Sequence, residues 1–306
     1  MKKTLAALLF SAAFAVPAFA QDADFYKGKS ITMLVASGAG GGYDTYARVF
    51  ARHAIKYIPG NPAGVPQNMT GAGGLKMANY LYEVATRDGT NIGMIANTFP
   101  AMQAAGVKGV MFDANQFNWI GSICPTVETM TVWKTTGVKS IEDARQKEVI
   151  AGATGRGAIT YMFPAMLNEF AGTKFKIVTG YPGGNDVTMA MEKGEVDARF
   201  GWSWGSLKSR SRPWLDEKKV NIIVQMGLEK AVDLPDVPLI MDFAKNETDR
   251  KALEFLFTPQ VTAWPLVAPP NVPEARVKML REAFMQTMKD PAFLAEAQKL
   301  SIEVDP

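Results

Sequence analysis

The sequence has one cysteine and one histidine in 306 residues, and each scarcity excludes a kind of site. Cys124 has no second cysteine to pair with, so no disulfide can form within the chain. Zinc usually takes several His or Cys ligands, and no His, Cys, Asp or Glu cluster here has metal-ligand spacing. No pair of carboxylates is placed for acid–base chemistry. We therefore expect no metal and no cofactor, and a buried structural thiol at Cys124.

Charge of one sign is also scarce. The 33 Lys and Arg residues nearly balance the 30 Asp and Glu residues, which leaves a net charge of +3. Lys2 and Lys3 contribute to this excess, and there is no basic block or acidic tail. Nucleic acid is therefore not an expected partner.

Long apolar runs are missing except at the start of the chain. There, "TLAALLFSAAFAVPAFA" follows Lys2 and Lys3 and ends in the small-residue pattern Ala18-Phe19-Ala20. The run is short for a membrane span, which needs about 20 apolar residues. It predicts a secretory signal peptide at residues 1–20, cleaved before Gln21. The mature chain is then exported, most simply to a bacterial periplasm.

Apolar runs of strand length alternate with helical patterns along the rest of the chain, which predicts α/β architecture with mostly parallel sheets. Two segments, "ITMLVASGAGGGYDTYARVFARH" and "VIAGATGRGAITYMFPAMLNEFAG", share the order strand, glycine-rich turn, helix and begin two similar halves. The expected strands are Ile31–Val35, Val65–Met69, Asn91–Ile95, Phe117–Ile120, Val127–Trp133, Val149–Ala151, Phe175–Val178, Val196–Phe200, Asn221–Gln225 and Thr262–Val267.

Glycine or small polar residues recur at the expected strand-to-helix turns. In an open α/β sheet these turns lie at the carboxyl ends of the strands, where ligands bind. Backbone N–H groups and helix N-termini there favour an anion. The first turn lacks the third glycine and the acidic residue of a dinucleotide site, and no P-loop occurs. The pattern predicts a small anion in a cleft, bordered by 37–42, 70–74, 154–157, 180–184 and 201–205.

Three further features of the sequence bear on the expectation that a small anion binds in the cleft. "GWSWG" matches the nucleophile elbow of serine hydrolases at Ser203, but no histidine follows it to act as the base. Trp202 and Trp204 fit cleft walls or hinge packing better. Arg156 lies inside the "TGRGA" turn and can pair with a carboxylate. Arg199 is a weaker candidate for the same role at the end of a strand.

These segments, taken together and in order, resemble the extracytoplasmic solute-binding proteins of tripartite tricarboxylate transporters, the Bug or TctC family. The resemblance runs from about Tyr26 to the C-terminus. It is carried by "GKSITMLVASGAGGGYDTYAR", "MTGAGGLKMANYLYEVATRDGTNIG", "GATGRGAITYMFPAMLNEFAG", "GYPGGNDVTMAMEKGEVDARF" and "DLPDVP".

The resemblance implies a two-domain type II periplasmic-binding-protein fold (Venus flytrap) with the ligand cleft between the domains. Domain 1 would comprise residues 21–125 plus 236–306, and domain 2 residues 126–235. It implies no enzyme activity. The ligand would be a di- or tricarboxylate or an aromatic acid, captured by a monomer and delivered to the membrane subunits of a tripartite transporter. An exported serine hydrolase using Ser203, or a ligand-sensing module for a signalling receptor, remain as alternatives.

The resemblance also implies which positions contact the ligand. From one domain these are Ser37, Gly41, Gly42, Asp44, Gly73, Gly74, Asn97 and Thr98. From the other they are Thr154, Gly155, Gly157, Ala158, Tyr181, Gly183 and Gly184, to which we add Arg156 and Trp202. The chain departs from the family at Ala153 and Ala158, where hydroxyls are lost, at Tyr161, where the family often has histidine, and at Arg156, where a cation is gained. Our hypothesis is that Arg156 contacts the ligand carboxylate directly.

Overall fold

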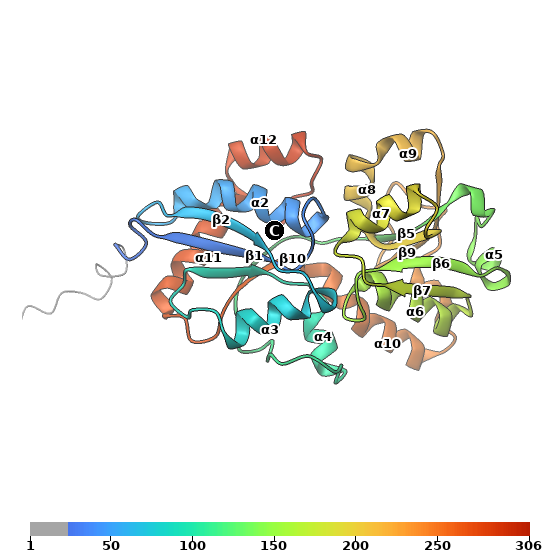
Figure 1. Cartoon of the computed structure of the whole chain (residues 1–306), viewed down its shortest axis with the longest axis horizontal. Coiled ribbons are helices and arrows are strands. Elements are labelled where there is room, and N and C mark those ends of the chain that lie inside the picture. Colours follow the sequence, from blue (N-terminus) through green and yellow to red (C-terminus); the bar gives the residue numbers. More distant parts are fainter. Residues whose placement is uncertain (1–23) are drawn as a thin grey trace, which may run out of the picture.

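The computed structural model describes residues 24–306, so the expected signal peptide at 1–20 lies outside the described residues. Two lobes lie side by side, each built around its own five-stranded sheet (Figure 1). We call the lobe that contains β1 the first lobe and the lobe that contains β6 the second lobe. The α/β class and the two-lobed binding-protein fold are as the sequence predicted.

The first lobe has the strand order β2-β1-β3-β10-β4. Strand β1 is parallel to β2 and β3, and β10 is antiparallel to β3 and β4. The strands are β1 (Ser30–Val35), β2 (Ala63–Asn68), β3 (Asn91–Met94), β4 (Asn118–Cys124) and β10 (Ala263–Ala268). The helices are α2 (Gly42–Ala54), α3 (Leu75–Glu83), α4 (Phe99–Ala104), α11 (Glu274–Met288) and α12 (Pro291–Lys299), with short 3-10 turns η1 (Ile55–Tyr57) and η2 (Ala72–Gly74).

The second lobe has the order β7-β6-β8-β5-β9, with β6 parallel to its neighbours and β5 antiparallel to β8 and β9. The strands are β5 (Glu128–Trp133), β6 (Val149–Ala153), β7 (Phe175–Thr179), β8 (Ala198–Ser203) and β9 (Val220–Met226). The helices are α5 (Ile141–Gln146), α6 (Ile159–Ala171), α7 (Gly184–Glu192), α8 (Trp204–Arg210), α9 (Arg212–Asp216) and α10 (Glu247–Phe257), with η3 (Lys134–Thr136), η4 (Ile240–Phe243) and η5 (Thr258–Thr262).

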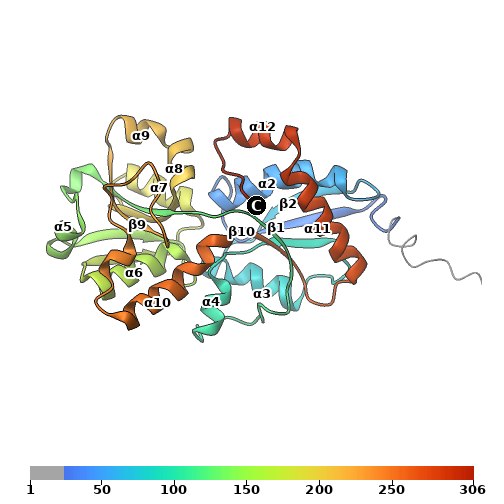
Figure 2. The same cartoon turned by 180° about the vertical axis from the view of Figure 1, so that it is seen from behind.

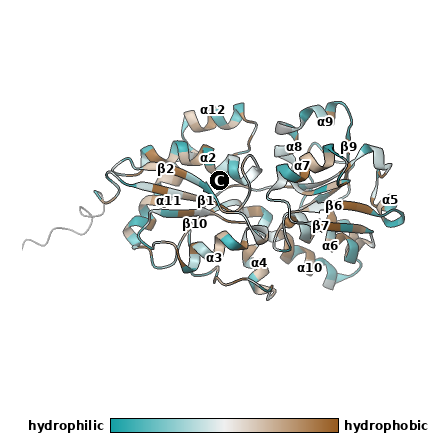
Figure 3. Ribbon diagram, in the orientation of Figure 1, coloured by the Kyte–Doolittle hydropathy of each residue, from teal (hydrophilic) through white to brown (hydrophobic). Residues whose placement is uncertain are grey.

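Each sheet is covered by helices on both faces, and side-chain alternation along the strands explains how. In β1, Ile31, Met33 and Val35 pack toward α2 and α11, whereas Leu34 packs toward α3 and α4. Successive side chains of a strand point to opposite faces, so a strand buried on both faces is apolar throughout. Figure 3 shows this as an apolar β6 inside the second lobe, with polar α5 and α9 outside. No helix among residues 24–306 is long and apolar enough to span a membrane.

The chain crosses between the lobes twice. It leaves β4 of the first lobe for β5 of the second, and it returns from α10 through η5 to β10 (Figure 2). Ile240, Leu253 and Phe257 are buried in the core of the second lobe. Residues 240–257 therefore pack with the second lobe, not with the first as we expected. We propose a division at 126–257, with the return crossing at about residue 258.

Candidate functional site

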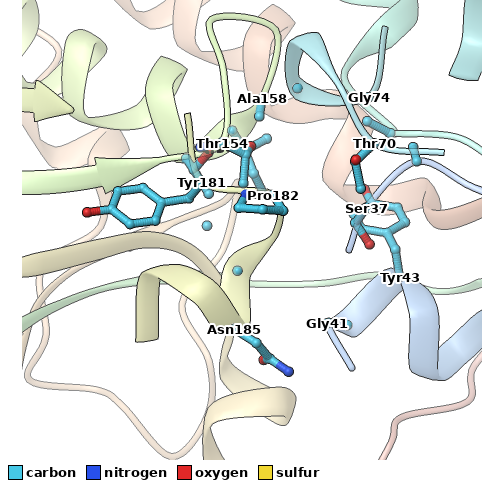
Figure 4. Close-up of a pocket in the computed structure, with 18 of the residues that line it drawn as sticks. Ser37, Gly41, Tyr43, Thr70, Gly74, Thr154, Ala158, Tyr181, Pro182 and Asn185 are labelled. Atoms are coloured by element: carbon cyan, nitrogen blue, oxygen red, sulfur yellow. Dashed lines mark hydrogen bonds between the residues drawn. The ribbon is translucent and has the colours of Figure 1, made fainter. Parts of the chain in front are cut away.

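A cavity of about 350 Å³ lies between the lobes where the strand-to-helix turns meet. Figure 4 shows Ser37, Gly41, Tyr43, Thr70 and Gly74 of the first lobe opposite Thr154, Ala158, Tyr181, Pro182 and Asn185 of the second. Of the predicted site residues, those that line the cavity are Ser37, Gly41, Gly42, Gly73, Gly74, Thr154, Ala158, Tyr181, Gly184 and Trp202. The predicted gathering of turns from both halves is therefore present.

Helices α2, α6 and α7 begin at the cavity, and no side chain caps their first N–H groups. The N-cap residues of α2, α6 and α7 are Gly41, Ala158 and Gly183, and none makes a side-chain capping bond. The first turn of a helix leaves backbone N–H groups without intrahelical partners, and the helix dipole adds positive potential there. The site thus presents hydrogen-bond donors from both lobes, an arrangement that binds an anion.

Two hydroxyl groups add to these donors. The Ser37 Oγ atom is buried and has no hydrogen-bond partner among the described residues. The Thr154 hydroxyl lies 3.1 Å from the Thr160 hydroxyl, which also accepts the Thr154 backbone N–H at 3.1 Å. A buried polar atom without a partner is uncommon in a folded protein. Ser37 is therefore positioned to donate to a group in the cavity.

Asp44 does not line the cavity and instead holds the first glycine turn in place. Its carboxylate accepts the Gly40 N–H at 2.8 Å, the Arg48 Nε at 2.8 Å and the Asn68 side-chain amide at 2.8 Å. Asn68 also donates to the Ser37 carbonyl at 2.8 Å. Burial would raise the pKa of Asp44, but the bonds from Arg48, Gly40 and Asn68 outweigh burial and lower it. Asp44 thus helps, through Asn68, to hold the backbone that carries Ser37 in place.

Asn97 and Thr98 also lie behind the cavity wall. Asn97 is bonded to the Tyr43 hydroxyl at 3.4 Å and donates to the Pro259 carbonyl at 2.9 Å. Thr98 is fully buried at the start of α4. Tyr43 itself lines the cavity, and burial, together with the nearby Glu128, raises the pKa of its hydroxyl. Neither Asn97 nor Thr98 lines the cavity, and the ligand roles that the resemblance implied for them stay a prediction.

Several predicted glycines contact the opposite lobe. A Cβ atom at Gly155 would lie 2.6 Å from the Gly73 nitrogen, and one at Gly157 would lie 2.9 Å from the Ala72 carbonyl oxygen. A Cβ atom at Gly183 would lie 3.1 Å from the Gly38 nitrogen. The glycines let two backbones approach each other across the cleft. Gly155, Gly157 and Gly183 therefore form contacts between the lobes and do not line the cavity.

The cation in the cavity wall is Arg199 rather than Arg156. Arg156 is exposed, does not line the cavity, and sits 5.8 Å from the Tyr161 ring centre. Arg199 is 6% exposed, lines the cavity, stacks 4.0 Å from the Trp202 ring centre, and donates to the Thr188 hydroxyl at 2.6 Å. The sequence signal for Arg199 was strand alternation. Phe200 faces the core of the second lobe, so the preceding residue, Arg199, points to the other side of the sheet.

The two tryptophans of "GWSWG" face different sides. Trp202 lines the cavity, whereas Trp204 donates to Asp233 at 2.5 Å beside a separate hollow on the surface. The Tyr181 ring points away from the first lobe in Figure 4 and packs with the Trp202 cluster.

Sequence reasoning missed Glu128 and Trp264 in the cavity wall. Trp264 holds φ of 58°, which bulky residues seldom adopt, and stacks on Tyr46 at 4.2 Å.

Ser203 has the surroundings of a helix cap and not of a nucleophile. Its hydroxyl accepts the Ser206 N–H at 3.3 Å and donates to the Ser206 hydroxyl at 2.7 Å. His53 lies in the other lobe, 2.7 Å from Glu296. An activated serine needs an adjacent base. Within residues 24–306 no group of His, Cys, Asp and Glu could hold a metal ion.

No family model matches the chain. A UPF0065 protein from the TAR-I ttuE-ttuC' intergenic region of Agrobacterium vitis is 26% identical over 299 residues, which cover 95% of this chain and 80% of that protein. The periplasmic binding protein BugD superposes with a TM-score of 0.73 at 20% identity, over 91% of this chain and 89% of BugD.

Two similar structures hold ligands. Rhodopseudomonas palustris Rpa4515 with adipate has a TM-score of 0.70 at 17% identity, and MatC from Rhodopseudomonas palustris with malate has 0.69 at 20%; each match covers 90% of this chain and 89% of the other. UPF0065 is the Bug family. The resemblance to Bug- and TctC-type binding proteins that the sequence motifs indicated is therefore confirmed.

Proposed function

We propose that this chain is a solute-binding protein that captures a small organic carboxylate between its two lobes and performs no chemistry on it. The observation that carries the proposal is the convergence of uncapped helix N-termini and the unpartnered Ser37 hydroxyl on one cavity from opposite lobes. These donors match the acceptor-only chemistry of a carboxylate. The adipate and malate of similar structures support the same ligand class.

The size of the cavity narrows the ligand further. Its volume of about 350 Å³ is near the lower end of ligand pockets, which span roughly 300–1,000 Å³. The wall is mostly backbone and aromatic, with Tyr43, Trp202 and Trp264 beside the glycine turns. A small di- or tricarboxylate or a single-ring acid fits this space.

The same proposal includes the setting in which the protein works. We propose that the signal peptide directs the chain to the periplasm and that the mature monomer delivers its ligand to the membrane subunits of a tripartite tricarboxylate-type transporter. Ligand contacts to both lobes stabilise the closed form, because only a difference in affinity between two conformations can shift their equilibrium. Genes for such subunits beside this one would support a transport role over a sensory one.

A melting experiment tests the proposal. The chain from Gln21 would be stripped of ligand by unfolding and refolding and then heated with dicarboxylates, tricarboxylates, aromatic acids and amino acids, with sugars as controls. A ligand at 100 times its Kd adds about 2.7 kcal/mol of stability, which raises the Tm of a chain of this size by several degrees. A folded protein that shifts with no acid would refute the proposal.

A substitution at Ser37 tests the proposal at the level of a single residue. Ser37→Ala removes one donor to the ligand, a loss of about 1 kcal/mol, and we expect the Kd to rise about fivefold. Ser30→Ala, at the exposed start of the strand that leads into the Ser37 turn, is the matched control and should leave the Kd unchanged. An unchanged Kd in Ser37→Ala would place the ligand away from this turn.

A further inference from the structure

The cavity contains an acidic group for which an anion supplies no partner. Glu128 is the first residue of β5, is 4% exposed, and lines the cavity opposite Ser203 of β8. Its Oε2 atom is buried and has no hydrogen-bond partner within the described part of the chain. Among the described residues that line the cavity, only Glu128 and Arg199 have charged side chains.

The charges around Glu128 come from three elements. Arg199 of β8 and Glu303 of the C-terminal segment both act on Glu128 electrostatically, and Glu128 in turn raises the pKa of Tyr43 of α2. Burial raises the pKa of Glu128 to about 8; Arg199 opposes this and Glu303 adds to it. Glu128 thus lies in the field of one cation and one further anion.

We propose that Glu128 and Arg199 form a second polar subsite, which selects an organic acid that also carries a protonated amine. This inference rests on the proposed function and names the ligand class. The ligand carboxylate takes the donors of the glycine turns, and its ammonium group donates to the Glu128 carboxylate. A buried charge is costly unless it is paired. An ammonium group supplies the partner that an ionised Glu128 lacks, which no simple dicarboxylate can do.

The contacts that Arg199 makes with its neighbours fit a rigid subsite. The guanidinium group is held by Trp202 on one face and by the Thr188 hydroxyl. A Cβ atom at Gly184 would collide with Arg199 Nη2, so this glycine leaves room for the guanidinium at the start of α7. Arg199 therefore keeps its positive charge in one place in the cavity wall. Its charge keeps the empty subsite close to neutral when Glu128 is ionised.

Calorimetric titration of the stripped chain at pH 8 with matched ligand pairs tests the inference. The pairs are aspartate with succinate and glutamate with glutarate, which differ only by the amine. We expect the better-bound amino acid to bind at least tenfold more tightly than its partner. Glu128→Gln should abolish this preference, because an amide has the same shape but no charge. Glu148→Gln, an exposed site in the same lobe, is the control and should preserve it.

The outcomes separate the inference from the proposed function. If no acid of either kind binds to the folded chain, the proposed function fails. If acids bind with equal affinity with and without the amine, or if Glu128→Gln keeps the preference, only the subsite is refuted. Tighter binding of the simple dicarboxylate would also refute it, because Glu128 would then act as a protonated donor.

The wild-type chain offers the same test without a substitution. Binding an ammonium group requires ionised Glu128, so affinity for the amino acid should rise between pH 6.5 and pH 8.5, while its amine stays protonated. Affinity for the simple dicarboxylate should not rise over this range. A flat profile for the amino acid would overturn the inference even if Glu128→Gln failed to fold.

Discussion

Asp44 illustrates how a residue can belong to a binding turn without touching the ligand. It is 2% exposed and bonds to the Gly40 N–H, Arg48 and Asn68, all of which shape the first glycine turn. Hydrogen bonds to charged groups contribute more than neutral ones, about 1.5–3 kcal/mol each. The carboxylate therefore stabilises the turn that presents Ser37.

Replacing Asp44 should destabilise the chain with or without ligand. We expect Asp44→Ala to lower the free energy of unfolding by about 2–3 kcal/mol, and the Tm by roughly 4–10 °C. The lowered pKa of Asp44 means that this stabilisation is present above the unfolded pKa, about 3.9, and is lost as pH falls below it. The Tm difference from wild type should therefore shrink in acid.

Thermal melts from pH 3 to pH 8 would measure this difference. Asp186→Ala is a matched control, because Asp186 lies in the first turn of α7 and makes no comparable set of bonds. A Tm loss as small as that of the control, or one that grows in acid, would contradict the supporting role of Asp44.

At the scale of elements, α2, α6 and α7 begin at the cavity and differ at their first residues from several helices elsewhere, whereas α8 begins at the cavity and is capped by Ser203. Ser140, Asn246 and Asp290 cap α5, α10 and α12 with their side chains. Gly41, Ala158 and Gly183 leave α2, α6 and α7 uncapped at the cavity. Side-chain caps contribute about 1 kcal/mol each. Their omission leaves N–H groups free for a ligand.

The turns themselves must also pass close to one another. Gly155→Ala would place a Cβ atom 2.6 Å from the Gly73 nitrogen. The atom it meets belongs to the backbone, so no side chain can move aside to relieve the overlap. Overpacking of this kind costs about 1–3 kcal/mol, and here it opposes only the contact between lobes. We expect the ligand Kd to rise roughly 5- to 150-fold, with little change in the Tm of the ligand-free chain.

Gly227→Ala provides the control for Gly155→Ala. Neither glycine has a left-handed φ, and a Cβ atom at Gly227 meets only ordinary contacts of 3.5 Å or more. Calorimetric titration of both variants with the ligand identified in the melting screen would separate the steric effect from the loss of a glycine. Equal affinities in the two variants would show that the turns need not touch for binding.

At the scale of the whole molecule, the two lobes touch through turns that are far apart in sequence. The turn at 37–42 meets the turn at 182–185, and the turn at 71–74 meets the turn at 155–158. These contacts cover the cavity and describe a closed form. Closure around a ligand by hinge motion is a known behaviour of two-lobed binding proteins.

Small-angle scattering would test this description. Because backbone contacts between turns bury little apolar surface, we expect the stripped chain to open. Its radius of gyration should exceed the value calculated for residues 24–306 of this structure. Saturating ligand should bring the two values together. A stripped chain that already matches the closed form, and does not change with ligand, would contradict ligand-driven closure.

The sequence by itself determined the strands and the edge at which they end. Each of the ten expected strands has a counterpart in the structure, because alternation and turn residues are local signals. The glycine turns gathered as expected, since carboxyl ends of parallel strands share an edge. Ser37, Thr154 and Trp202 line the cavity for this reason.

The tertiary structure alone decided which of those residues face the cavity. Gly155 and Gly73 meet only because two lobes pack against each other, and no local pattern encodes that contact. Glu128 reads as the start of an ordinary strand, and its place beside the cavity depends on its register opposite Ser203. The structure likewise places Arg199, and not Arg156, in the cavity wall. Burial is set by what packs around a side chain, and the residues that pack around these come from distant parts of the chain.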